Sequence, residues 1–124
     1  MKETIYPTLE EAIYLHNILL DRFGGARGVL DKGLLESALA RPRSGYYRSL
    51  SEQAAALMQS LAMNHPFVDG NKRVAFALTA VFLKLNGLSL KAEPQDGLHF
   101  VEVTLIKERA ALDLITSWIE VRVR

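Results

Sequence analysis

The 124-residue sequence contains no cysteine, has a single tryptophan and carries almost no net charge. The lack of cysteine excludes disulfides, thiol nucleophiles and thiolate metal sites, and is typical of a reducing compartment. A net charge of +1 argues against binding dominated by a polyanion such as nucleic acid. The longest apolar run, from Val74 to Leu83 and interrupted only by Thr79, is too short to cross a bilayer of about 30 Å. We therefore expect a cytoplasmic protein without membrane segments or direct nucleic-acid contacts.

The remaining composition is that of a globular protein, with 49% apolar and 23% charged residues. A chain of this length is sufficient for one hydrophobic core and leaves little room for a second. No repeats, low-complexity tracts or linkers interrupt it. We therefore expect one domain over residues 1–124.

Helical signals cover most of the chain. Thr8 with Glu11 and Ser49 with Glu52 form capping-box patterns, and Asp31 is a further candidate N-cap. Apolar stripes at helical spacing follow these residues and end at glycines or before Pro42. Helices are therefore predicted over 9–23, 32–41, 50–64, 71–86 and 110–121, with a polar and aromatic loop over 41–50.

One segment is ambiguous, "LHFVEVTLI" at residues 98–106. Val101, Val103 and Leu105 alternate with polar residues, and this pattern also suits a β-strand. Because helical patterns dominate elsewhere, an all-α bundle of about six helices is the best architecture. The helix over 71–86 is apolar on nearly every side and is predicted to lie at the centre of the bundle.

The stretch "HPFVDGNKR", residues 65–73, leads directly into that predicted central helix. A helix N-terminus offers unpaired N–H groups and the positive end of its dipole, so it favours anions. Gly70 permits a tight turn and close approach of a ligand, while Asn71, Lys72 and Arg73 add donors. Asp69 would repel a bare phosphate but is useful if it holds Mg²⁺ against phosphate oxygens. His65 is able to accept a proton from an attacking hydroxyl near neutral pH.

The same stretch resembles the Fic/Doc motif, in which a histidine, proline, phenylalanine, acid, glycine and asparagine precede a glycine or lysine and then an arginine. The surrounding sequence resembles the Doc, or death-on-curing, branch of this family in "LHNILLDRFGG" and "GLLESALARP". The resemblance covers almost the whole chain. It implies a compact helical bundle in which residues 98–106 are helical.

Two positions depart from the adenylyl-transferring members of that family. Those enzymes usually have glycine where this chain has Lys72, and a second arginine where it has Phe76. In Doc-like toxins, lysine at this position is associated with ATP bound in the reverse sense. The resemblance then implies transfer of the γ-phosphate to elongation factor Tu, with ATP and Mg²⁺ as cofactors and a partly disordered, Phd-like antitoxin as partner.

By position in the motif, the resemblance assigns a role to each site residue. His65 would be the base, Asp69 would act on Mg²⁺ and orientation, and Asn71, Lys72 and Arg73 would hold phosphates, with Arg73 also counted as catalytic. Gly70 would keep the turn open at the nucleotide. Tyr46 and Tyr47 are candidates for a flap that aligns the target peptide.

Other interpretations stay open at this point. The nine residues could transfer AMP rather than phosphate, or could form only an anion-binding turn in a non-catalytic partner-binding module. An isolated turn of this composition is usually only a helix cap. His16 lies on an apolar stripe and is predicted to be a hydrogen-bonded core residue, and His99 a surface or packing residue.

Overall fold

The computed structural model describes residues 3–124 and begins its helices at the predicted caps. At the start of α1 (Leu9–Phe23), the Thr8 hydroxyl accepts from the N–H of Glu11, whose carboxylate accepts from the N–H of Thr8. Ser49 and Glu52 repeat this arrangement at α3 (Leu50–Asn64), and Asp31 caps α2 (Lys32–Ala40). These caps are confirmed.

The chain turns tightly after α2. Residues Arg41–Arg43 form a short 3₁₀ turn, η1, in which Pro42 is buried. Pro42 has no N–H to donate to a helix carbonyl, so it cannot continue α2. It is tolerated at the second position of η1, where the N–H groups of a short helix have no partner within that helix. The prediction that α2 stops before Pro42 is confirmed, and the loop that was predicted over 41–50 begins with this turn.

The ambiguous segment is helical. A short α5 (Pro94–His99) continues into η2 (Phe100–Lys107), which is a π-helix, and α6 (Leu112–Glu120) follows. In η2, Phe100, Val101 and Leu105 are buried while Glu102 is exposed. The buried residues are four and five positions apart, from Val101 and Phe100 to Leu105, so the alternation in the sequence does not mark a strand. Residues 3–124 contain two isolated β-bridges and no β-strand.

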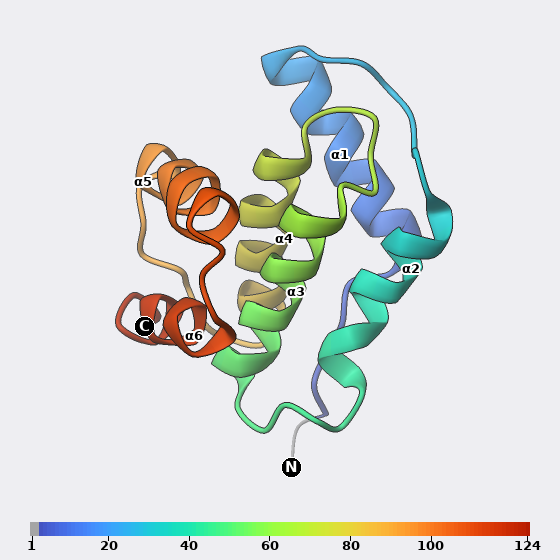
Figure 1. Cartoon of the computed structure of the whole chain (residues 1–124). Coiled ribbons are helices and arrows are strands. Elements are labelled where there is room, and N and C mark those ends of the chain that lie inside the picture. The colour runs from blue at the N-terminus through green and yellow to red at the C-terminus, as the bar shows by residue number, and fades with distance from the viewer. Residues whose placement is uncertain (1–2) are drawn as a thin grey trace.

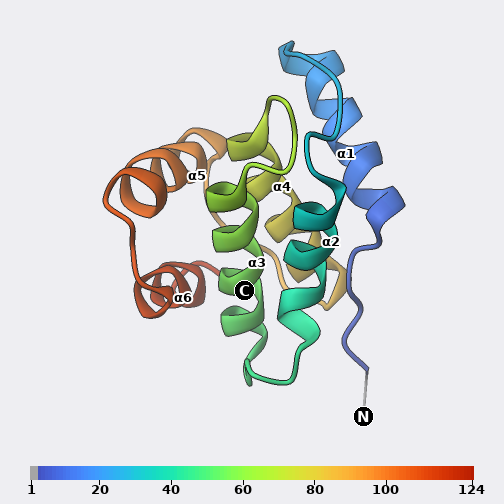
Figure 2. The ribbon, with the colours of Figure 1, turned by 45° about the vertical axis from the view of Figure 1, so that its right-hand side comes forward.

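α3 and α4 (Asn71–Leu85) form an antiparallel pair in the middle of the bundle, with α1 and α2 on one side and α5, η2 and α6 on the other (Figures 1 and 2). The core draws on α1, α2, α3, α4, η2 and α6. α3 is the most enclosed helix, since nine of its residues are buried, whereas α4 leaves Val81 and Leu85 exposed. The sequence predicted the central position for α4 alone, whereas α4 shares it with α3.

No helix within residues 3–124 is long and apolar enough to span a membrane.

Gly97 allows α5 to lie unusually close to α4. A Cβ atom at Gly97 would lie 2.1 Å from Cε1 of Phe76, far inside van der Waals contact. The ring of Phe76 therefore occupies the space that any other residue at position 97 would need. This contact fixes the distance between the two helices one turn beyond the start of α4.

Gly97→Ala is expected to lower the free energy of unfolding by about 1–3 kcal/mol through overpacking against Phe76. Helix propensity alone predicts the opposite sign, because alanine is favoured over glycine by about 1 kcal/mol within a helix. Urea unfolding of both proteins measures the difference. Phe76→Leu in the Gly97→Ala background should recover part of the loss, and a stabilised Gly97→Ala protein would contradict this account of the contact.

Candidate active site

The loop between α3 and α4 is bounded by two residues in the left-handed region. His65 ends α3 with φ 48° and ψ 58°, and Gly70 precedes α4 with φ 78°. Glycine adopts this conformation freely, but for other residues it costs roughly 1–2 kcal/mol. A glycine or asparagine is usual at such a helix end, so an exposed histidine held there points to a functional reason for the side chain.

The side-chain amide of Asn71 closes this loop. Its Oδ1 accepts from the N–H of Phe67 at 2.9 Å, and its Nδ2 donates to the carbonyl of Phe67 at 2.9 Å. Both ends of the amide are therefore used within the protein. Asn71 acts on the site by shaping the loop, and its own backbone N–H lies in the first turn of α4. If Asn71 contacts phosphate as predicted, it would do so through this backbone N–H and not through the side chain.

Phe67 anchors the loop in the core beneath the site. It is 1% exposed, and its ring stacks on that of His16 with centroids 3.9 Å apart. His16 Nε2 lies 2.8 Å from the carbonyl oxygen of Asp69, which requires the tautomer with hydrogen on Nε2. His16 is thus a hydrogen-bonded core residue, as predicted, and supports the loop from below.

A second loop lies against the motif and was not predicted from the sequence. Residues 24–31 pair with it through a β-bridge between Val29 and Phe67. The N–H of Val68 donates to Gly28 O at 3.0 Å, and the N–H of Leu30 donates to Pro66 O at 2.8 Å. The signal for this pairing was the cluster of glycines at positions 24, 25 and 28, of which only Gly24 and Gly25 were interpreted, as a helix stop.

Asp69 is held by this second loop. Its Oδ2 accepts from Ala26 N at 3.1 Å, and its Oδ1 accepts from Gly70 N at 2.8 Å. Hydrogen bonds from these two N–H groups hold the pKa of the Asp69 carboxyl below its usual range, so the group stays ionised. Each oxygen keeps a lone pair for a further partner. Any residue larger than glycine at position 25 would crowd Oδ2, since a Cβ there would lie 2.9 Å from it.

The motif lines a cavity of about 300 Å³ at the start of α4. No side chain caps this helix, so its first N–H groups face the cavity unpaired by a cap. Arg73 packs its guanidinium 3.9 Å above the ring of Phe23, and Lys72 Nζ lies 3.3 Å from Glu102 Oε1. The predicted site residues brought together here are His65, Asp69, Gly70, Asn71, Lys72 and Arg73; Val68 completes the lining.

Tyr46 and Tyr47 are not part of this site. They precede α3, whereas His65 follows it, and the length of a 15-residue helix separates the two ends by about 22 Å. Figures 1 and 2 both place the two loops at opposite ends of the bundle. Tyr47 instead accepts a hydrogen bond from Arg41 Nε at 2.7 Å, and Tyr46 is 82% exposed. Residues 24–31, and not these tyrosines, lie beside the motif.

The donor set fits a metal shared with a phosphate ligand rather than one held by protein alone. Within residues 3–124 there is no group of three or more His, Asp or Glu side chains that could enclose a metal ion. Mg²⁺ typically binds through one or two carboxylates and completes its shell with water and phosphate oxygens. Asp69, ionised and beside an uncapped helix N-terminus, meets that requirement.

The helical bundle places a histidine, a carboxylate and two cations around an uncapped helix N-terminus, an arrangement that favours an anionic ligand. The model of the Fic/DOC family matches residues 6–83, which is more than half of the chain and includes the whole motif. The chain therefore belongs to the Fic/DOC family.

Two curated proteins are similar to it. Toxin Doc of Mycolicibacterium smegmatis is 50% identical over 76 residues, which cover 57% of this chain and 58% of that protein. Protein kinase doc of Escherichia phage P1 is 34% identical over 90 residues, which cover 69% of this chain and 71% of that protein. The match to the Mycolicibacterium protein thus spans less than two thirds of its length.

Asn71→Ala should destabilise the protein by about 1–3 kcal/mol, because it leaves the N–H and carbonyl of Phe67 without their partners. Asn71→Asp should recover only the bond to the N–H, since a carboxylate cannot donate to the carbonyl. Urea unfolding should give the order wild type, then Asp, then Ala. Equal stability of wild type and Asn71→Ala would show that the amide does not hold the loop.

Proposed function

We propose that this protein is a Doc-like toxin enzyme that transfers the γ-phosphate of ATP to a hydroxyl of a translation factor, elongation factor Tu, and so arrests translation. The observation that carries the proposal is the cavity at the start of α4, which is lined by the exposed base His65, the ionised carboxylate of Asp69 and two cationic side chains. Membership of the Fic/DOC family, and the phage P1 relative named as a protein kinase, support it.

In this mechanism the chain contributes binding, orientation and a base. The N–H groups of the first turn of α4 and the cations of Lys72 and Arg73 bind the phosphates. Asp69 is the residue that would hold Mg²⁺, and the bound ion would neutralise charge on the phosphates. His65 takes the proton of the target hydroxyl as its oxygen forms a bond to the γ-phosphorus and the bond to the β-phosphate oxygen breaks. ADP leaves, and the proton stays on His65.

The conformation of His65 suits this role. The ring stands at the cavity rim on an exposed residue, so a large substrate is able to reach it. The loop beneath it is fixed by Asn71 and by the buried ring of Phe67. A base on a rigid support keeps its distance to the phosphate, which is most of what phosphoryl transfer requires from the protein.

Incubation with elongation factor Tu and ATP labelled separately at the γ and α phosphates tests the reaction. Label from the γ position alone is expected. His65→Ala should reduce the rate by about a hundredfold or more, as loss of a general base does, and should abolish growth arrest when the protein is expressed in bacteria.

Label from the α position would replace this proposal with adenylyl transfer, in which the same motif presents a different phosphate to His65. Growth arrest by His65→Ala equal to that of the wild type would instead favour a non-catalytic partner-binding module. Thermal unfolding of His65→Ala should stay close to that of the wild type, since the side chain at position 65 is exposed, and this excludes misfolding as the cause of lost activity.

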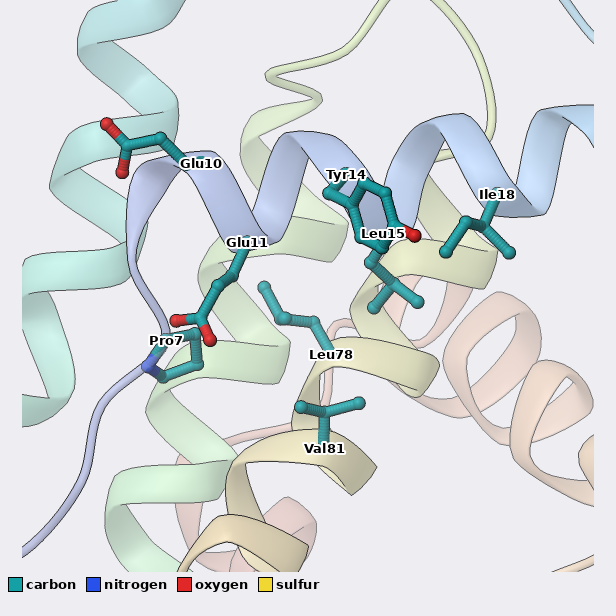
Figure 3. Close-up of a pocket in the computed structure, with 8 residues that line it drawn as sticks. All are labelled: Pro7, Glu10, Glu11, Tyr14, Leu15, Ile18, Leu78 and Val81. Carbon is teal, nitrogen blue, oxygen red and sulfur yellow. The ribbon is translucent and has the colours of Figure 1, made fainter.

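The proposal includes a partner, a cognate antitoxin of the Phd type with a disordered segment that folds on binding. An open apolar groove between α1 and α4, about 560 Å³ in volume, is the surface that suits such a segment. Figure 3 shows Leu15 and Ile18 of α1 facing Leu78 and Val81 of α4. Glu10 and Glu11 lie at one end of the groove, so an apolar helix with lysine or arginine at that end would complement it.

Ile18→Glu should leave the toxin active but resistant to its cognate antitoxin, because a carboxylate would replace the apolar contact at a residue that is 41% exposed. Co-expression and growth measure this, and binding of the purified pair should weaken by at least about tenfold. Leu114→Glu, at a comparably exposed position on α6 (49%), is the matched control and should be neutralised normally. An Ile18→Glu toxin that is still neutralised would place the antitoxin elsewhere.

A further inference from the structure

The two positions that depart from the adenylyl-transferring pattern, Lys72 and Phe76, contact the same neighbour. They lie one helical turn apart on α4. Lys72 pairs with Glu102 of η2, and the ring of Phe76 packs on Gly97 of α5. The continuous helix formed by α5 and η2 therefore lies against both, and it begins after residue 83, where the family match ends.

The two partners lie on successive segments of the opposing helix. Lys72 and Phe76 are four residues apart on α4, whereas their partners Glu102 and Gly97 are five residues apart, with Gly97 in α5 and Glu102 in η2. The close contact at Gly97 sets the distance between the helices, and the next turn brings Glu102 to Lys72.

The charges at the cavity explain why a partner for Lys72 matters. Lys72 and Asp69 have opposite signs and line the same cavity. A lysine side chain is long and mobile, so without another partner its ammonium group could fold onto the Asp69 carboxylate and cover the metal-binding oxygens. Glu102 does not line the cavity but holds Lys72 Nζ from the side of η2. Only one donor of the ammonium group is used, which leaves two for phosphate oxygens.

We propose that Glu102 is a positioning residue: it holds Lys72 at the cavity rim, away from Asp69 and ready to bind phosphate. This inference rests on the proposed function for the identity of the ligand as a nucleotide with Mg²⁺. The ion pair is half exposed, at 47% for the lysine and 58% for the glutamate side chain, so it contributes little to folding. Its effect is on where the ammonium group lies.

Titration calorimetry with Mg·ATP tests the role of Glu102, because the two possible roles predict opposite changes in affinity for Glu102→Gln. Glu102→Gln should weaken binding by roughly two- to fivefold, the range expected for loss of an exposed ion pair. A carboxylate that acted only as a nearby negative charge would repel the phosphates, and its removal would tighten binding. Unchanged or tighter binding by Glu102→Gln therefore overturns the proposal.

Two variants make the comparison specific. In a Lys72→Ala background, Glu102→Gln should no longer weaken Mg·ATP binding, because the group that it positions is gone. Glu108→Gln removes the same charge from an exposed residue at the end of η2 and should bind as the wild type does. A similar loss in either of these proteins would contradict a role through Lys72.

Nuclear magnetic resonance on the nucleotide-free protein separates this inference from the proposed function. The ε-carbon of Lys72 should be more mobile in Glu102→Gln than in the wild type, while thermal unfolding stays the same. If the wild-type protein binds no Mg·ATP, the proposed function fails, and Lys72 mobility alone then decides whether Glu102 positions it. Equal mobility in both proteins overturns the inference.

Discussion

The site depends on the two hydrogen bonds between the side-chain amide of Asn71 and the backbone of Phe67. They join the first residue of α4 to Phe67, whose aromatic ring is buried in the core. The start of the helix and the position of the loop are therefore fixed relative to each other. His65 then falls at the rim, and the N-terminus of α4 opens into the cavity. Because the N-cap position is Gly70, which has no side chain, the helix start has no side-chain cap and its N–H groups stay available for an anion.

Around this clamp, the charged groups are held mainly by backbone atoms and by neighbouring elements. Asp69 is kept ionised by N–H groups from two loops, Arg73 rests on the ring of Phe23, and Lys72 reaches η2. Each neighbour comes from a different part of the chain. The site is consequently a meeting point of α1, the loop after it, α4 and η2, and a change in any of these is able to alter the position of a charge without touching the motif itself.

Local patterns predicted most of the helices because their causes are local. The capping boxes at Thr8 and Ser49 and the stop at Pro42 each involve residues close in sequence, and the structure confirms them. The alternation in residues 98–106 was ambiguous because a π-helical register depends on how Val101 and Leu105 pack against the core. Tyr46 and Tyr47 were placed near the motif by sequence order alone, but the intervening α3 carries them to the other end of the bundle.

By itself the sequence determined the all-α class, the extent of most helices and the six predicted residues that line the cavity at the start of α4, since these follow from caps, periodicity and short spacing. Only the tertiary structure decided that residues 24–31 hold Asp69, that His16 supports the loop from the core, and that Glu102 pairs with Lys72. These contacts join residues up to 53 positions apart, as between His16 and Asp69. No local pattern encodes such distances, because they arise from the way that whole helices pack.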